Sequence, residues 1–237
     1  MKRKRRRAPQ AGPTTIYLIR HAETDINLRG ICQSQTVDSK LSRRGVEQAK
    51  KLAKWAQDED IAAVYSSPLC RAVRTAEIAF GGKKIIEIDE LMEQHCGALS
   101  GKTVDEMLEI LAREGIVGPK ERPNRKNPWH MLRYGDRFGG ESDSEVFERG
   151  MRAIKRIAKR HPGKKVAVVA HGRLNRLLLC GFAGRELDSR NYGEITQSNA
   201  CINVLKAHGG KVRVAGINRT DHLKPESRGN KKRRARR

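Results

Sequence analysis

Short apolar runs alternate along this chain with longer segments of helical periodicity, and that alternation limits the folds it can adopt. Runs rich in Ile, Val, Leu and Ala predict strands over residues 15–19, 62–66, 84–88 and 165–170. Apolar residues at helical spacing predict helices over residues 42–57, 68–80, 103–114 and 174–180. Ser142 and Glu145 fit a capping box that opens a long helix to about residue 160. Strands over 200–207 and 211–218 flank Gly209-Gly210, which predicts a closing hairpin.

Strands separated by helices need crossover connections, which favour parallel pairing with helices on both faces of the sheet. We therefore expect an α/β fold, a three-layer α/β/α sandwich around a mostly parallel central sheet, as one domain over residues 14–223. Residues 115–141 are rich in Pro, Gly, Asn and charged residues, and they predict an insertion or lid beside the sheet.

The net charge of +23 is concentrated at the two ends of the chain. Residues 1–10 contribute six positive charges and residues 224–237 a net seven, which leaves ten on residues 11–223. Blocks of like charge repel themselves, so we expect disordered basic tails over residues 1–13 and 224–237. Such tails serve polyanion or nucleic-acid contact or nuclear import, or they are simply solvated. Because no aromatic residues interleave with the basic ones, base stacking is not expected.

Other features of the sequence indicate the cellular compartment. No apolar run approaches the roughly 20 residues that span a bilayer. No apolar stretch follows the basic residues at the start, which argues against a secretory signal. The five cysteines are scattered and form no C-x-x-C pair, so we expect reduced thiols and neither a zinc site nor a disulfide framework. We expect a cytoplasmic protein, or a nuclear one if the host has a nucleus.

Candidate catalytic residues follow the predicted strands. In open α/β sheets, ligands bind outside the carboxyl ends of the strands. Arg20 and His21 follow the first strand, Arg71 follows the second, and His171 follows the apolar strand at 165–170. Glu93 lies shortly after the third strand. These side chains should therefore converge on one edge of the sheet.

This set of residue types suits the transfer of a phosphoryl group. Guanidinium groups bind phosphate oxygens in a bidentate manner, and a neutral imidazole can attack phosphorus. A second histidine can donate to the phosphate oxygens as their charge grows, and a carboxylic acid can protonate the leaving alkoxide. Glu93 is the acid best placed by spacing. The sequence has no Walker loop and no metal-ligand spacing, so we expect neither a metal nor another cofactor.

The same residues stand in an ordered series of motifs that resembles the histidine phosphatase superfamily, phosphoglycerate mutase-like branch. The resemblance covers roughly Thr15 to Leu223. The matching motifs are Arg20-His21-Ala22-Glu23-Thr24, Asn27, Gly30-Ile31-Cys32-Gln33, Leu41 to Ala49, Ser66 to Ala72, Thr75-Ala76, Gly140-Glu141-Ser142, Ala170-His171-Gly172, Asn199, Asn218 and His222-Leu223.

The resemblance implies a role for each candidate. His21 would be the nucleophile that becomes phosphorylated. Glu93, ahead of Glu23 or Glu90, would be the general acid and later the base that activates water. Arg20, Arg71 and His171 would form the phosphate pocket, and His171 would also be catalytic. Asn27 would lie near the same phosphate oxygens.

Departures from the family pattern bear on the type of reaction. Ala22 replaces the usual glycine after the histidine, and Ser34 stands where many members have glycine. Gln94 and Cys96 stand where mutases have Arg and Tyr, and Arg133-Tyr134 is the nearest match to a mutase-like Arg-Arg pair. A mutase needs extra cations and exclusion of water to retain its phosphoryl group. The resemblance therefore favours a phosphatase over a phosphoglycerate mutase.

Alternatives remain open at this level. The leading hypothesis is a phosphomonoester hydrolase that acts through a phosphohistidine on a small phosphorylated metabolite. The second is a phosphoglycerate mutase, and the third, of another class, is a polyanion- or nucleic-acid-binding protein that uses its basic tails. The cationic residues of the 115–141 segment favour a polyanionic small molecule or are solvated surface: Lys120, Arg122, Arg125, Lys126, Arg133 and Arg137. The sequence does not specify the natural substrate or the oligomeric state.

Overall fold

A six-stranded sheet in the order β3-β2-β4-β1-β5-β6 forms the centre of the molecule. The computed structural model describes residues 12–118 and 128–224, and the elements given below are those of that part of the chain. The strands are β1 (Thr14–Arg20), β2 (Ile61–Ser66), β3 (Ile85–Glu87), β4 (Lys165–Ala170), β5 (Ile202–His208) and β6 (Lys211–Arg219). The first four strands pair in parallel, and β5 and β6 pair antiparallel with their neighbours. The expected mostly parallel sheet is confirmed.

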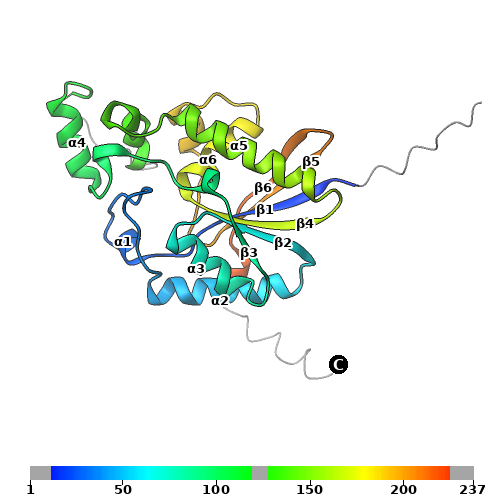
Figure 1. Cartoon of the computed structure of the whole chain (residues 1–237). Coiled ribbons are helices and arrows are strands. Elements are labelled where there is room, and N and C mark those ends of the chain that lie inside the picture. Colours follow the sequence, from blue (N-terminus) through cyan, green and yellow to red (C-terminus); the bar gives the residue numbers. More distant parts are fainter. Residues whose placement is uncertain (1–11, 119–127, 225–237) are drawn as a thin grey trace, which may run out of the picture.

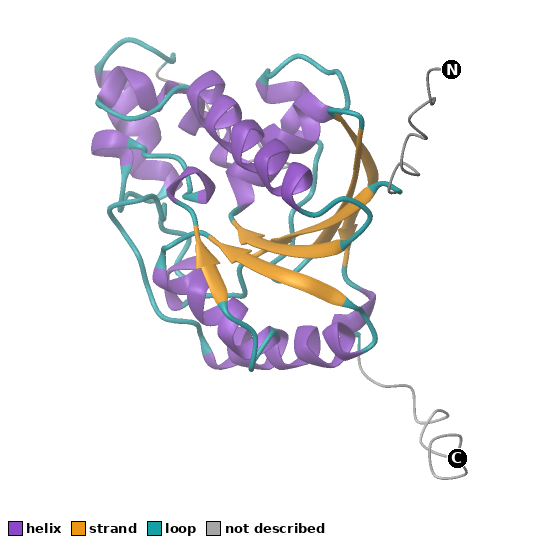
Figure 2. Cartoon of the chain, turned by 45° about the vertical axis from the view of Figure 1, so that its right-hand side comes forward, coloured by secondary structure: helices purple, strands orange, loops and turns teal. Residues whose placement is uncertain are grey.

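Helices cover both faces of this sheet (Figures 1 and 2). On one face lie α2 (Arg43–Gln57) and α3 (Cys70–Ala79), and on the other lie α5 (Asp143–Arg160) and α6 (Gly172–Phe182). Residues of β1 alternate between the two layers. Ile16 and Leu18 pack with residues of α5 and α6, whereas Tyr17 and Ile19 pack with residues of α2 and α3. The expected three-layer α/β/α sandwich is therefore present.

The ends of the helices follow local sequence signals, with one difference. Ser142 and Glu145 form the expected capping box, with reciprocal bonds of 3.2 and 2.8 Å at the start of α5. In contrast, Pro68 does not open α3, which begins at Cys70 with Leu69 as its N-cap and no side-chain cap. The other α-helices are α1 (Asp25–Leu28), α4 (Val104–Arg113) and α7 (Ser189–Gly193). The sequence did not predict α1 and α7, because one turn of helix is too short to show periodicity.

The register of the central strands brings the predicted site residues together. β1 and β4 are parallel neighbours, and Arg20 lies opposite Ala170. The residue that follows each of these two strands is a histidine, so His21 and His171 lie side by side at the end of the sheet. β2 pairs with the other side of β4, with Ser66 opposite Val169, and it delivers the chain toward Arg71. The site therefore lies at the carboxyl edge of the parallel strands, where open α/β sheets bind their ligands.

The segment predicted as an insertion packs against the chain that follows Glu93. Pro128–Phe138 forms 3-10 helix, while residues 119–127, including Lys120, Arg122, Arg125 and Lys126, lie outside the described residues. Gly97 has a φ of +54°, and a Cβ there would lie 1.8 Å from the carbonyl oxygen of Phe138. Backbone thus touches backbone at this point, which only glycine permits. Whether the segment acts as a lid stays a prediction.

The predicted basic tails fall almost entirely outside the described residues, which begin at Gly12 and end at Lys224. Their disorder and their role therefore stay predictions. Among the residues that the structure does describe, no helix is both long and apolar enough to cross a membrane.

Candidate active site

A cavity of about 220 Å³ opens at the carboxyl edge of the parallel strands, and five of the six predicted site residues line it. They are Arg20, His21, Asn27, Arg71 and Glu93. The sixth, His171, is fully buried, and its ring centroid is 5.3 Å from that of His21. A larger cavity of about 560 Å³ lies at the opposite edge, between the end of α5 and the β5–β6 turn. None of the predicted site residues lines it, so the smaller cavity is the candidate active site.

His21 presents one ring nitrogen for reaction. Its main-chain N–H donates to the carbonyl of Ala170 at 2.9 Å, which ties it to β4. Nδ1 lies 2.7 Å from the carbonyl oxygen of Ala22. Because a carbonyl can only accept, Nδ1 carries the proton and Nε2 keeps its lone pair. Burial, and then the charges of Arg71 and Arg20, hold the pKa of His21 well below its ordinary value, so the ring is neutral near pH 7.

The residue after the histidine supports that arrangement without needing glycine. The φ of Ala22 is not in the left-handed region. Its N–H donates to the Thr75 hydroxyl at 3.0 Å, and its methyl group is buried against Ala49 and Ala200. The departure from the family glycine at this position therefore costs no backbone strain. Thr75, one of the matched motif residues, holds the turn that carries His21.

The last residues of the domain hold His21 from the other side. The N–H of Ala200 donates to the carbonyl of His21 at 3.1 Å. The Asn199 side chain donates to the same carbonyl at 3.3 Å and to the Asn27 amide oxygen at 3.1 Å. The His222 ring lies 3.0 Å from the carbonyl of Ala200. These bonds give the motif residues near the end of the domain a structural role at the site, and they orient Asn27 at the cavity wall.

The two predicted arginines are held in place but keep unused donors. Arg71 is fully buried, and its guanidinium donates to Asp38 at 2.7 Å and to the Ser34 carbonyl at 3.1 Å. Arg20 donates through Nη1 to the carbonyl of Gln197. The Nε atoms of both arginines are buried without a hydrogen-bond partner in the described part of the chain. Ser34, a departure from the family pattern, thus contributes a carbonyl that positions Arg71.

His171 also has polar atoms that are buried and unpaired. Neither of its ring nitrogens has a hydrogen-bond partner among the described residues, although the residue is fully buried. Burial, and then the charges of Arg71 and His21, hold its pKa well below the ordinary value. Together with the two arginine Nε atoms, four buried polar atoms around His21 are unsatisfied. Since buried polar groups are nearly always paired, this cluster points to an anionic ligand that would complete it.

Glu93 is fixed through both its carboxylate and its main chain. The carboxylate accepts bonds at 3.1 Å from the main-chain N–H groups of Gln94, Arg173 and Leu174, the last two at the start of α6. Glu23 instead accepts from the Ser42 hydroxyl, and Glu90 pairs with Arg156. Neither Glu23 nor Glu90 lines the cavity, so of these three glutamates only Glu93 does.

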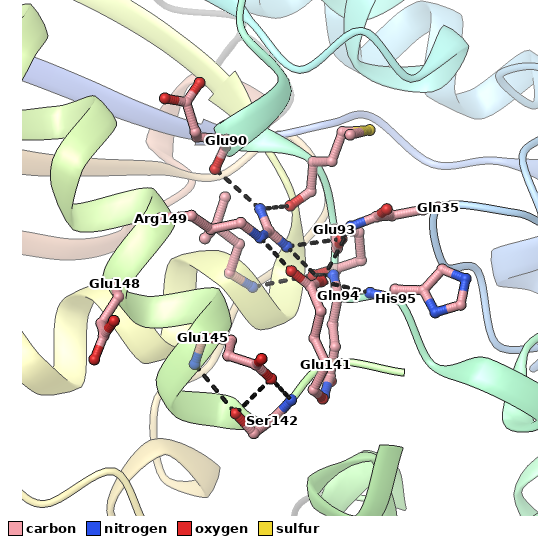
Figure 3. Close-up of polar contacts among 12 residues, drawn as sticks. Gln35, Glu90, Glu93, Gln94, His95, Glu141, Ser142, Glu145, Glu148 and Arg149 are labelled. Atoms are coloured by element: carbon pink, nitrogen blue, oxygen red, sulfur yellow. Dashed lines mark hydrogen bonds and ion pairs between the residues drawn. The ribbon is translucent and has the colours of Figure 1, made fainter. Parts of the chain in front are cut away.

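Arg149 of α5 clamps the segment that carries Glu93 (Figure 3). Its Nη1 donates to the carbonyls of Glu90 and Met92 at 2.9 and 2.6 Å. Its Nη2 donates to the Glu93 carbonyl at 3.0 Å and to Glu141 at 3.0 Å, and its Nε donates to Glu141 at 2.7 Å. All five donors of a guanidinium are thereby used. Arg149 and Glu141 therefore set the position of Glu93 from outside the cavity wall.

Further residues at the cavity were missed by the sequence reasoning. Arg173 and Arg176 of α6 line it, two and five residues after His171, and Trp129 and Leu132 of the 128–138 segment also line it. Arg176 follows Arg173 by three residues, which puts the two on the same face of a helix, and that spacing was the signal that could have linked them. Asp38, which anchors Arg71, had no such signal, because it lies in an irregular loop.

The positions that the resemblance assigns to mutase residues do not line the cavity. The Gln94 side chain donates to the carbonyls of Leu132 and Glu141, and Cys96 is buried in an apolar cluster. Arg133 bonds to the hydroxyl of Tyr134 at 2.7 Å and its guanidinium lies over that ring. None of these residues lines the cavity. Within the described residues, no group of three or more His, Cys, Asp or Glu could hold a metal ion.

The sequence is similar to those of known proteins. The family model of the histidine phosphatase superfamily (branch 1) matches residues 16–220. A metal-independent phosphoserine phosphatase of Arabidopsis thaliana is 31% identical over 216 residues, which is 89% of this chain and 83% of that protein. The phosphoglycerate mutase-like protein 4 of the same plant is 29% identical over 199 residues, 82% of this chain and 80% of that one.

The similarity extends to solved structures. A phosphoserine phosphatase of Entamoeba histolytica, crystallised in complex with 3-phosphoglyceric acid, superposes with a TM-score of 0.72 at 27% identity. The match covers 89% of this chain and all of that one. The fold is therefore shared with this phosphatase, whose crystal structure contains a small phosphorylated acid.

Proposed function

Because the chain belongs to the histidine phosphatase superfamily, we propose that it hydrolyses a small phosphomonoester through a phosphohistidine at His21. The observation that carries the proposal is a cluster of buried nitrogen atoms that have no hydrogen-bond partner in the described part of the chain, around a histidine whose Nε2 keeps its lone pair. They are the Nε atoms of Arg20 and Arg71 and the two ring nitrogens of His171. A phosphate dianion bound there would accept from the two arginines and from the protonated nitrogen of His171, and it would place phosphorus against the neutral His21 ring.

In the first half of the reaction, the lone pair of His21 Nε2 attacks phosphorus. The bond from phosphorus to the ester oxygen breaks, and Glu93 supplies the proton that turns the departing alkoxide into an alcohol. The arginines and His171 stabilise the charge on the phosphoryl oxygens as it shifts. The bond from Nδ1 to the Ala22 carbonyl stabilises the positive charge that forms on the ring.

In the second half, water replaces the alcohol. The water oxygen attacks phosphorus while the Glu93 carboxylate takes a proton from that water. The bond from phosphorus to Nε2 of His21 breaks, and its electrons return to Nε2. Inorganic phosphate leaves, and Glu93 holds the proton for the next cycle. Every step uses groups of this chain, so we expect the reaction to proceed without a metal.

Hydrolysis is favoured over the mutase reaction by the residues at the mutase-like positions. The Gln94, Cys96 and Arg133 side chains, which stand at or near the positions of mutase ligands, do not line the cavity. A mutase must retain a phosphorylated acid and exclude water while it reorients. The phosphatase names among the relatives support the same choice.

The experiment measures phosphate release from p-nitrophenyl phosphate by the wild type and by His21→Ala, each with a chelator. We expect the wild type to keep its activity with the chelator and His21→Ala to lose it by several orders of magnitude. Release that persists in His21→Ala would show that the nucleophile is wrongly assigned. No release by the wild type would favour the mutase or a binding role, and phosphoglycerate isomerisation would then be measured.

The basic ends support a further contact, with a polyanion such as nucleic acid. Their six and net seven positive charges are enough to bind a phosphate backbone in a salt-dependent manner. Removing residues 1–10 and 224–237 should abolish salt-sensitive binding of duplex DNA and leave phosphate release unchanged. Binding that survives truncation would contradict this role for the tails.

A further inference from the structure

A second cavity, about 560 Å³ in volume, lies at the end of the sheet opposite the candidate active site. The start of β1, the last turns of α5 and the turn between β5 and β6 line it. Figure 1 shows these three parts at the end of the molecule away from α1 and α4. Thr14 lines the second cavity and Arg20 lines the active site, and the strand between them spans about 20 Å. The proposed hydrolysis uses no residue of the second cavity.

The lining of the second cavity is cationic. Three lysines and a histidine belong to it, and the described residues that line it include no Asp or Glu. Lys155, Lys159 and Lys211 are exposed and make no ion pair within the described part of the chain. Lys155 and Lys159 are four residues apart on α5, so their like charges repel each other. An anion bound beside them would offset that repulsion.

The three segments that build the second cavity are free of acidic residues. Residues 1–22, 149–185 and 195–220 contain none of the 27 Asp and Glu of the chain. Every residue that lines the second cavity belongs to one of these segments. Elsewhere the signs are mixed, as on α2, where Lys50 pairs with Glu47 at 2.8 Å. The charge around the second cavity is therefore of one sign, and it attracts an anion.

The cationic surface continues beyond the second cavity. Arg160 and Lys164 follow the lysines of α5, Arg213 follows Lys211 on β6, and all three are exposed without an ion pair in the described residues. The six positive charges of residues 1–10 join the domain at Gly12, which lines the cavity. Cations that extend along α5, along β6 and into the N-terminal segment suit a polymeric anion better than a single small one.

Between the cations, the lining is apolar and held in place. Ala158, Ala207 and Val212 contribute apolar side chains. The Thr14 hydroxyl donates to the carbonyls of Ala158 and His161 at 3.1 and 2.8 Å, which ties β1 to the end of α5. Thr14 also pairs with Ala207 in the register of β1 and β5. The volume lies in the range of small-ligand sites, so one nucleobase fits it.

We propose that the second cavity binds one unstacked base of a single-stranded nucleic acid, while Lys155, Lys159 and Lys211 bind the neighbouring phosphates. The ring of His208 also lines the cavity and offers a surface for stacking. A single strand can present an unstacked base, whereas a duplex keeps its bases paired. This inference extends the polyanion contact proposed for the basic ends, and it is independent of the proposed hydrolysis.

The first test removes charge from the second cavity of the full-length protein. Fluorescence anisotropy measures binding of labelled oligo-dT of about twelve nucleotides over a range of salt concentrations. In Lys159→Gln/Lys211→Gln the slope of log K against log salt should become shallower by about 1.4, because each phosphate contact to a single strand contributes roughly 0.7. Lys83→Gln/Lys84→Gln is the matched control, since it removes the same charge from exposed lysines next to β3, at the far edge of the sheet. Equal changes in both variants would mean general attraction to a basic protein and would overturn the inference.

The second test fills the apolar hollow without changing the charge. For the wild type, unlabelled oligo-dT should compete on the order of 10-fold better than inorganic polyphosphate of the same charge, because polyphosphate has no base to insert. In Ala158→Phe, and separately in Val212→Phe from the other wall, the two competitors should become equal. Equal competition already in the wild type would overturn the inference. Displacement by phosphatidylserine vesicles as effective as displacement by oligo-dT would assign the surface to a membrane instead.

Two further measurements separate this inference from the other proposals. Phosphate release should be the same in every cavity variant, because the active site lies at the other end of β1, and thermal unfolding shows that each variant is folded. Removing residues 1–10 and 224–237 tests the basic ends on their own. If that truncation abolishes binding of oligo-dT while the cavity variants change nothing, the contact of the ends stands and the second cavity has no part in it. No binding by the wild type would refute both.

Discussion

The Nη2 atom of Arg149 donates to the carbonyl oxygen of Glu93 at 3.0 Å, so a residue of α5 fixes the main chain of the proposed general acid. The same guanidinium holds the carbonyls of Glu90 and Met92 on the preceding residues. Glu141 binds Arg149 on one side and the N–H of His95 at 2.8 Å on the other. The acid is thus mounted on a short segment that is braced along its length.

Arg149 should therefore act on catalysis through the position of Glu93. We expect Arg149→Lys to lower kcat/KM for an alkyl phosphate on the order of 100-fold, because a small displacement of a catalytic group is enough. The loss of kcat/KM for p-nitrophenyl phosphate should be much smaller, since kcat/KM reports the phosphorylation of the enzyme and p-nitrophenolate leaves without a proton. Steady-state kinetics with both substrates measure the difference, and Arg152→Gln on the same helix is the matched control. Equal losses for the two leaving groups would indicate a general structural defect.

Alanine at position 22 should stabilise the folded protein more than glycine would. Its backbone is not in the left-handed region, and its buried methyl group packs with Ala49 and Ala200. Ala22→Gly should lower the free energy of unfolding by about 1 kcal/mol and leave kcat within about twofold. Denaturant unfolding and phosphate release check the two statements. A large gain in kcat from Ala22→Gly would mean that alanine impairs the His21 turn.

Stability should fall in acid because of the two buried histidines. Burial, followed by the charge of Arg71, lowers the pKa of both His21 and His171 in the folded state. In the unfolded chain they titrate near 6.5. As the pH falls below about 6.5, the unfolded chain takes up protons that the folded chain does not, so the free energy of unfolding decreases. The slope reaches about 1.4 kcal/mol per pH unit for each histidine.

His171→Gln isolates one of those contributions. Its free energy of unfolding should depend on pH less steeply below pH 6.5, by up to about one proton. Urea unfolding between pH 4.5 and 7.5 measures the slope, in a buffer without phosphate so that no anion binds the site. An unchanged slope would show that His171 titrates normally in the folded protein.

The sequence predicted the parts of this molecule that depend on local order along the chain. The sandwich follows from alternating strands and helices, and the meeting of His21 with His171 follows from two parallel strands that end at one edge. The capping box of α5 could be predicted from Ser142 and Glu145, because it joins two residues that are three positions apart in the sequence. Each of these features is set by neighbours in sequence or by the rules of parallel sheets.

What the sequence did not predict depends on contacts between distant segments. Arg149 is 56 residues from the carbonyl of Glu93 that it holds, and Asp38 is 33 residues from Arg71. The sequence around a charged residue on a helix or in a loop does not indicate which distant residue it will bind. Likewise, the carbonyl of Ile195 that orients Arg176 lies in a turn whose path only the folded chain defines.

Trapping the intermediate tests whether His21 carries the phosphoryl group. Glu93→Gln should slow the attack of water, so the intermediate should accumulate in that variant. The variant is mixed with p-nitrophenyl phosphate, quenched in alkaline denaturant within one turnover, digested, and mapped by mass spectrometry. Phosphate is expected on the peptide that contains His21, and none is expected in Glu93→Gln combined with His21→Ala. Turnover with no phosphorylated peptide, or phosphate on any other residue, would contradict this role of His21.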